Sequence, residues 1–333
     1  MKYTSKQPVS IVGIGEILWD MLPGGKRIGG APANFALHAH ALGAQAQIIS
    51  SIGQDKHGRE IVQQLSHKQI EMEHIQYKRE HPTGRVDVQV GDNGQPKYMI
   101  HEDVAWDHIQ FSPEMKVLAE KCDAVCFGSL AQRNPVSRSS IQEFLANTKT
   151  CCLRIFDINL RQDYYSKEII ESSLLTANVL KLNDDELVVL QALIDLPINT
   201  ESALKALLIR YQLDFLAFTQ GASGSIMMDK NNNISHCPGI SVNIKDTVGA
   251  GDSFTAAMIM GKLSGLALAK INLLANKVAA FVCSQAGATP ALPACLTSEL
   301  TEQIPVPIRK MVDHLPAQKT KKSDFGKTKQ SAL

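Results

Sequence analysis

The 333-residue sequence predicts an α/β fold in which a doubly wound, mostly parallel sheet is flanked by helices on both faces. Two observations support this prediction. Short apolar strands alternate along the chain with helical segments, which is the pattern of a parallel sheet with helical crossovers. A hydrophobic content of 44% is sufficient for a large core that is covered on both sides. A separate stretch with strict apolar–polar alternation predicts an additional small β-hairpin.

The individual elements follow from hydrophobic periodicity in chain order. Strands are expected where short apolar runs occur, at residues 9–14, 47–52, 124–127, 153–157, 179–182 and 215–219. Helices are expected where apolar residues recur at helical spacing, at 33–42, 58–68, 135–146, 184–190, 200–211, 251–262 and 271–284. A further strand is expected at 240–244, where apolar and polar residues alternate.

The hairpin is predicted from residues 84–90, which alternate between valine and polar residues. A Gly-rich turn follows at 91–94, and a second short run follows at 97–100. An antiparallel hairpin inserted in an α/β chain is a candidate lid over a ligand site. The alternative is an edge hairpin without a functional role.

The bulk properties exclude several classes of function. The net charge of +1 provides no electrostatic attraction to nucleic acid or to an anionic membrane surface. No apolar run is as long as a membrane span, and the N-terminus lacks the apolar core of a signal peptide. Seven cysteines without C-x-x-C spacing favour a reduced, cytoplasmic location. One folded domain is expected over 1–317, followed by a disordered Lys-rich tail at 318–333.

The most informative segment is D-T-V-G-A-G-D-S-F at 246–254. Gly249, Ala250 and Gly251 have small side chains, so a ligand can approach their backbone N–H groups at the start of a helix, where anions bind. Asp252 in the same turn can remove a proton from a hydroxyl group beside that anion. The positive helix end is expected to lower its proton affinity, which makes it a weak base. Together these features predict phosphoryl transfer to an alcohol.

Other nucleotide-binding and metal-binding motifs are absent or incomplete. The sequence has no G-x-x-x-x-G-K-[ST] loop. Gly13 and Gly15 follow a strand, but Leu18 interrupts the dinucleotide-binding fingerprint, so an NAD-binding protein is disfavoured. The D-F-G at 324–326 lies in the predicted tail, without the other protein-kinase motifs. The ten histidines show no metal-ligand spacing.

Two further segments have residue types suited to a sugar ligand. Asp20 is expected directly after the first strand, where its carboxylate can accept two sugar hydroxyls. Gly29 and Gly30 precede a helix and expose backbone N–H groups, and Asn34 can both donate and accept. The alternatives are a turn residue for Asp20 and an ordinary helix N-terminus with proline near its first turn for the glycines.

Two segments near the chain's middle are candidates for the nucleotide site. Asn183 followed by Glu186 supplies oxygen ligands suited to Mg²⁺, although the same pair is also a helix capping box. Thr219, Gly221 and Gly224 form a glycine-rich loop whose alternative is a simple turn between two strands.

The segment 246–254 resembles the signature of the ribokinase-type (PfkB) sugar kinases, and the resemblance covers residues 9–293. The forms G-E-I-L-W-D at 15–20, G-G-A-P-A-N at 29–34 and A-W-D at 105–107 resemble those of bacterial fructokinases within that family. The resemblance implies a ribokinase-like fold, with a lid at about 10–25 and 82–107. In this family such lids often pair between subunits, which implies a homodimer.

The resemblance also implies a role for each matching residue. Asp252 is the base, and Gly249, Ala250 and Gly251 form the anion hole. The implied sugar ligands are Asp20, Gly29, Gly30, Asn34 and Arg161. The implied ATP-binding residues are Asn183, Thr219, Gly221, Gly224 and Asn276. Asn183 and Glu186 would organise Mg²⁺, and a K⁺ site would use Asp246, Val248, Val282, Gln285 and Gly287. Ala291 stands where ribokinases place serine, so one oxygen ligand for K⁺ is missing.

These expectations define an ATP-dependent sugar kinase, with fructose as the expected substrate and fructose 6-phosphate as the product. Within the same family, 2-keto-3-deoxygluconate or a riboside are alternative substrates. An alternative of a different class is a catalytically silent sugar sensor on the same fold. The presence of base, anion hole and N-x-x-E motif argues against the sensor.

Overall fold

The computed structural model describes residues 8–22, 24–90 and 96–301, and it confirms the α/β prediction. Its large sheet has nine strands in the order β13-β12-β11-β10-β9-β8-β1-β4-β5. In this spatial order, all neighbouring strands between β5 and β11 pair in parallel. Strand β12 pairs antiparallel with β11 and with β13. The strands are β1 (Ser10–Ile14), β4 (Gln45–Gly53), β5 (Ile75–Lys78), β8 (Ala124–Phe127), β9 (Leu153–Asp157), β10 (Val179–Asn183), β11 (Phe215–Thr219), β12 (Ser225–Asp229) and β13 (Ile234–Cys237).

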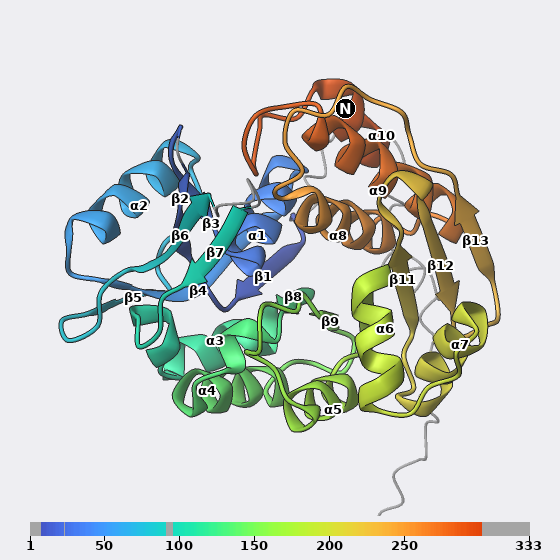
Figure 1. Cartoon of the computed structure of the whole chain (residues 1–333), viewed down its shortest axis with the longest axis horizontal. Helices are drawn as coiled ribbons and strands as arrows, with labels where there is room; N and C mark the ends of the chain where they lie inside the picture. The colour runs from blue at the N-terminus through green and yellow to red at the C-terminus, as the bar shows by residue number, and fades with distance from the viewer. Residues whose placement is uncertain (1–7, 23, 91–95, 302–333) are drawn as a thin grey trace, which may run out of the picture.

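Helices cover both faces of this sheet (Figure 1). One face packs against α1 (Ala31–Ala41), α2 (Lys56–His67), α8 (Ala250–Leu263), α9 (Leu268–Cys283) and α10 (Ala294–Thr301). The other face packs against α3 (Pro113–Lys121), α4 (Pro135–Ala146), α5 (Lys167–Thr176), α6 (Asp184–Leu193) and α7 (Thr200–Arg210). Three short 3₁₀ helices complete the list: η1 (Ala105–His108), η2 (Leu130–Gln132) and η3 (Gly221–Ser223).

Strand alternation divides the apolar side chains between two cores. In β11, Phe215 packs in the core beneath α8 and α9, whereas the next residue, Leu216, packs in the core beneath α6 and α7. Ile11 and Val12 of β1 divide in the same way. Because neighbouring side chains of a strand point to opposite faces, a continuous apolar run is required wherever both faces are buried. This requirement explains why the six predicted strands of the large sheet were recognisable.

A second sheet of four strands lies beside α1 and α2, at the end of the molecule opposite β13 (Figure 1). Its order is β3-β2-β6-β7, from β2 (Leu18–Leu22), β3 (Gly25–Gly29), β6 (Gly84–Val90) and β7 (Pro96–Ile100). The predicted hairpin is present as the antiparallel pair β6–β7. The expected lid boundaries differ from this sheet, because residues 10–14 form β1 in the large sheet and residues 25–29 form β3.

The two ends of the hairpin, residues 81–83 and 101–108, are called the lid roots below. Trp106 and Asp107 in the second root are buried, with the guanidinium of Arg133 stacked over the Trp106 ring and bonded to Asp107 at 2.8 Å. Thr83 in the first root bonds the Asp55 carboxylate through its N–H and its hydroxyl. The A-W-D segment therefore anchors the small sheet to the body of the protein.

One predicted element is wrong, and several were missed. Residues 240–244 form no strand, because no neighbouring strand pairs with them, and the Ile240 and Ile244 side chains are exposed. The missed elements are mostly short or at sheet edges: β2, β3, β5, β12, β13, α3, α5 and α10. The predicted tail at 318–333, with its D-F-G, lies outside the described residues. Among the helices that are described, none is both long and apolar enough to cross a membrane.

Candidate active site

The turn before α8 contains the residues that the sequence predicted for an anion hole. Gly249 is its N-cap with φ of +79°, and a Cβ atom at this position would clash with the Ala288 carbonyl. Ala250 donates its N–H back to Thr247 at 3.3 Å. The N–H groups of Gly251 and Asp252 belong to the first turn and have no acceptor within the helix. The turn therefore offers donors to a bound anion.

Asp252 follows in the first turn of α8 and meets Asn34 from α1. The Asn34 Nδ2 atom donates to Asp252 Oδ2 at 2.9 Å, which joins two motifs that lie 218 residues apart. Burial, together with the nearby charge of Asp157, raises the pKa of Asp252 to about 6. The expectation of a weak base is thus wrong, because burial and a like charge outweigh the favourable bond from Asn34.

A buried polar cluster lies beneath this turn and consists of Asp157, Lys181 and Thr255. Lys181 Nζ lies 3.0 Å from Asp157 Oδ1, and the Thr255 hydroxyl donates to Asp157 Oδ2 at 2.9 Å. Burial alone would lower the pKa of Lys181, but the carboxylates of Asp157 and Glu186 outweigh it and raise the pKa. A Cβ at Gly251 would lie only 3.1 Å from Lys181 Nζ, so a positive charge stands directly under the anion-hole turn.

Lys181 was missed by the sequence analysis, although one signal was available. It occupies the middle of strand β10 between Leu180 and Leu182, with 6% of its surface exposed. Lysine is almost never fully buried without a partner, so a lysine within a buried strand indicates a compensating carboxylate nearby. The sequence does not reveal that this partner is Asp157 on the adjacent strand.

Asp20 lies on β2 of the small sheet, not after a strand of the large sheet as expected. Its carboxylate approaches Gly29 on β3 so closely that any side chain at position 29 would collide with it. Burial raises the pKa of Asp20 to about 6, against the opposing charge of Arg161 and with a smaller contribution from Asp246. Gly29 is therefore required by the position of the Asp20 carboxylate.

A second carboxylate, Glu16, was missed and is almost completely buried. Its Oε1 atom accepts the Ala31 N–H at 3.2 Å, whereas its Oε2 atom has no hydrogen-bond partner among the described residues. Burial raises the pKa of Glu16 to about 7. Gly30 has φ of +108° and its Cβ would clash with the Glu16 carbonyl, so packing by itself explains this glycine.

Arg161 is exposed and lies on the same side of the molecule as these carboxylates. Its positive charge opposes the rise in the pKa of Asp20, Asp252 and Glu16 that burial causes. Among the predicted sugar ligands, Asn34 contacts the predicted base directly, and Arg161 acts on Asp20 and Asp252 through its charge. A direct contact of Gly29 or Gly30 with a sugar stays a prediction.

The Asn183–Glu186 pair forms a reciprocal capping box at the start of α6. Asn183 Oδ1 accepts the Glu186 N–H at 2.9 Å, and Glu186 Oε2 accepts the Asn183 N–H at 2.8 Å. Glu186 Oε1 also accepts the Leu160 N–H at 3.3 Å. The structural role is thus present, and a role in metal binding can coexist with it because each carboxylate oxygen has more than one lone pair.

The other predicted nucleotide residues lie around β11 and α9. Thr219 ends β11 beside Asn183 of β10, and Gly221 and Gly224 bound the 3₁₀ turn that follows. Gly224 has φ of +101°, and a Cβ would clash with the Cys237 carbonyl. The Asn276 amide bonds Ser225 Oγ at 2.7 Å, within a buried network that joins α9 to β12. A contact of any of these residues with ATP stays a prediction.

The predicted K⁺ ligands come together, but the Asp246 carboxylate already has partners. Asp246 accepts the N–H groups of Val248 and Gly287, both at 3.1 Å. It also pairs with the guanidinium of Arg27, which reaches across from β3 of the small sheet. Val282 and Gln285 meet in the turn after α9, where the Gln285 N–H bonds the Val282 carbonyl. Arg27 was not predicted, because nothing local in the sequence relates it to position 246.

A protein-family model described as pfkB family carbohydrate kinase matches residues 24–295. This match spans most of the chain and includes every part of the site described above except its N-terminal carboxylates. The chain belongs to the pfkB family of carbohydrate kinases. The prediction of a ribokinase-like sugar kinase is confirmed at this level.

Individual relatives agree with this assignment. An uncharacterised sugar kinase of Pyrococcus horikoshii is 31% identical in sequence, over 79% of this chain and 83% of its own. The structure of its ATP complex superposes with a TM-score of 0.73, which covers 88% of this chain and 99% of that chain. A fructokinase of Salmonella typhimurium is 28% identical in sequence, over 84% of this chain and 95% of its own. The structure of Vibrio cholerae fructokinase with fructose, ADP and calcium has a TM-score of 0.73 over 88% and 99%, and at 24% identity it supports the fold alone.

The buried Lys181–Asp157 pair generates a stability prediction. Replacing Lys181 by methionine leaves the Asp157 carboxylate buried without its partner, which should lower the free energy of unfolding by about 3–5 kcal/mol. Chemical denaturation at pH 7 measures this loss. The matched control is Lys205→Met, which removes an exposed, solvent-screened pair with Glu201 and should leave the free energy of unfolding almost unchanged. Equal effects of the two substitutions would contradict the proposed importance of the buried pair.

Proposed function

We propose that the protein transfers the γ-phosphoryl group of ATP to a primary hydroxyl of fructose, giving fructose 6-phosphate. The observation that carries this proposal is the hydrogen bond between Asn34 and Asp252 beside the N-terminus of α8. It brings a group suited to sugar recognition, a base and backbone donors for an anion into one place. The pfkB family membership and the fructokinases among the relatives support it.

Asp252 would act as the general base. Asn34 holds its Oδ2 atom, so the Oδ1 atom is available to accept the hydroxyl proton. As the sugar oxygen bonds to the γ-phosphorus, the bond from phosphorus to the β-phosphate oxygen breaks, the proton passes to Asp252, and ADP leaves. A pKa of about 6 keeps Asp252 mostly ionised at neutral pH while making it a stronger base than an ordinary aspartate.

The transferring phosphoryl group would lie over the anion-hole turn. The N–H groups of Gly251 and Asp252, with the Lys181 ammonium beneath them, would offset the negative charge on its oxygens. The adenosine end of ATP would extend toward Thr219, Gly224 and Asn276.

The oxygen-rich composition of this region fits Mg²⁺. Asp157 and Glu186 are buried carboxylates close to the turn, and Asn183 lies beside them. Because both Glu186 oxygens already accept N–H groups, the ion would be held largely through water. When bound with ATP, Mg²⁺ supplies positive charge to the phosphate oxygens.

Three further features stay proposals. K⁺ binding would require Asp246 to exchange its Arg27 partner for the ion, so we propose at most a weak response to K⁺. A homodimer would form through the small sheet, as the family resemblance implies. A cytoplasmic location is supported by the seven cysteines, none of which forms a disulfide. Even Cys122 and Cys152, whose Sγ atoms lie 3.6 Å apart, are both free thiols.

Asp252→Asn should lower kcat by about 10²–10⁴-fold, because the hydroxyl proton loses its acceptor. Sugar affinity should change little, since the amide oxygen can still accept the Asn34 bond. A coupled ADP-release assay measures turnover, and calorimetry measures sugar binding. The matched control is Asp163→Asn at an exposed position. Turnover close to that of the parent enzyme would remove Asp252 from the role of base.

The activity should fall steeply as the pH is lowered through about 6. Both Asp20 and Asp252 have their pKa raised to about 6, and both must be ionised, one to accept sugar hydroxyls and one to accept a proton. A plot of log(kcat/KM) against pH should therefore approach a slope of two on its acidic limb. Asp20→Asn should reduce this slope to about one. An unchanged slope in that variant would show that Asp20 does not control the acidic limb.

A panel of sugars separates fructose from the alternatives. We expect kcat/KM for fructose to exceed that for 2-keto-3-deoxygluconate and for ribosides. Asp20→Asn should raise the KM for fructose by about 10–100-fold, because hydrogen bonds to a charged group are lost. A preference for an acidic sugar would instead point to Arg161 as the main specificity residue. Tight sugar binding without ADP release would favour the sensor.

A further inference from the structure

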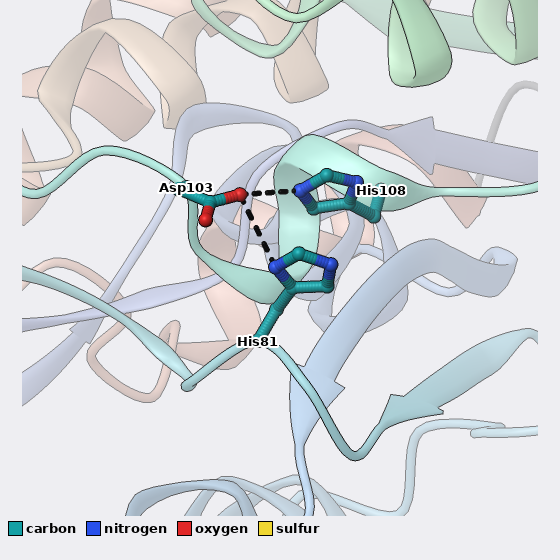
Figure 2. Close-up of side chains that lie close together, drawn as sticks. All are labelled: His81, Asp103 and His108. Carbon is teal, nitrogen blue, oxygen red and sulfur yellow. Dashed lines mark hydrogen bonds and ion pairs between the residues drawn. The ribbon is translucent and has the colours of Figure 1, made fainter.

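The lid roots carry three side chains that could bind a metal: His81, Asp103 and His108 (Figure 2). His81 precedes β6, whereas Asp103 and His108 follow β7. His108 Nε2 lies 2.8 Å from Asp103 Oδ1, and His81 Nδ1 lies 3.2 Å from the same oxygen. The two imidazole rings are stacked, with their centroids 3.5 Å apart. No role in phosphoryl transfer uses these residues.

The contacts within this group are incomplete. His81 Nδ1 is shielded from solvent, yet its approach to Asp103 does not have the geometry of a hydrogen bond. A shielded polar nitrogen without a partner is unusual and costs free energy. The Asp103 side chain, in contrast, is 76% exposed, and its Oδ1 atom approaches one nitrogen at the edge of each ring. One ligand atom from each residue lies within 4.8 Å of the other two, so a single ion can contact all three.

We propose that His81, Asp103 and His108 form a binding site for a divalent transition-metal ion such as Zn²⁺. Two imidazole nitrogens and one carboxylate oxygen are a donor set that suits Zn²⁺, with the fourth tetrahedral position left to water. Mg²⁺ prefers oxygen ligands, so the site is distinct in chemistry from the proposed ATP-bound magnesium. Each imidazole must offer a free ring nitrogen to the ion, so protons compete with Zn²⁺ for the site.

The position of the site defines its consequence. An ion held by His81 and His108 links the two lid roots and so restrains the hairpin β6–β7. Strand β6 pairs with β2 at Asp20↔Val86, so the same restraint reaches the strand that carries Asp20. We expect Zn²⁺ to slow backbone hydrogen exchange in the lid roots and to change the KM for sugar. The second effect rests on the proposed sugar site, whereas metal binding and hydrogen exchange do not.

The test is a Zn²⁺ titration of the full-length protein against a competing chelator at pH 7.5. Because Cys151 and Cys295 are exposed and thiolates are ligands for Zn²⁺, the protein should carry serine at both positions. We expect one Zn²⁺ per chain, with affinity at least about 10-fold weaker in Asp103→Asn and in His81→Gln. Cobalt(II) in place of Zn²⁺ should give the visible absorption of a tetrahedral site with nitrogen ligands.

Asp103→Asn is the decisive variant, because its exposed side chain can change without disturbing folding. The matched control is His236→Gln, which removes an exposed histidine on β13 and should leave Zn²⁺ affinity unchanged. The proposal is overturned if Asp103→Asn and the double variant His81→Gln/His108→Gln bind Zn²⁺ as tightly as the parent. It is also overturned if Zn²⁺ leaves hydrogen exchange in the lid roots unchanged.

Discussion

The structure depends on a buried ion pair between Lys181 and Asp157. These residues lie on adjacent parallel strands, and Thr255 of α8 bonds the same carboxylate. Charges buried in a core are costly, and an apolar pair of similar volume is often as stable. The pair lies directly beneath the turn that begins α8, so it places a positive charge where a phosphate would bind. It also joins α8 to β9 and β10, and the position of Asp252 follows from that connection.

The carboxylates around this turn make the site unfavourable for the folded protein when no ligand is bound. Asp20, Glu16 and Asp252 all have raised pKa values, caused chiefly by burial, so their ionised forms are less stable in the folded chain than in the unfolded chain. The positive charge of Arg161 only partly offsets the effect of burial on these pKa values. The cost is absent below pH 4, grows between about pH 4 and pH 6–7 as the groups ionise in the unfolded chain but stay protonated in the folded one, and is constant above that range. At Asp20 and Asp252, stability is thus given up at residues that the proposed reaction requires to be charged.

The small sheet shows how elements distant in sequence build one site. Asp20 lies on β2, and Arg27 reaches from β3 to pair with Asp246 next to the anion-hole turn. The hairpin β6–β7 extends this sheet, and its roots are held by Arg133, Asp107 and Asp55. Restraint at the lid roots can therefore reach the proposed sugar ligands through strand pairing, without any direct contact.

The sequence by itself determined the class of fold, the main strands and helices, and the presence of a glycine-rich turn at 249–252 before a helix. These depend on local patterns: continuous apolar runs, helical periodicity, and small residues directly before a helical segment. Only the tertiary structure decided that Asp20 belongs to the small sheet, that residues 240–244 form no strand, and that Asp252 has a raised pKa. It alone revealed the partners of Lys181, Asp246 and His81. The reason is that burial and pairing depend on which segments, distant in sequence, become neighbours in space. A local sequence pattern does not specify those neighbours.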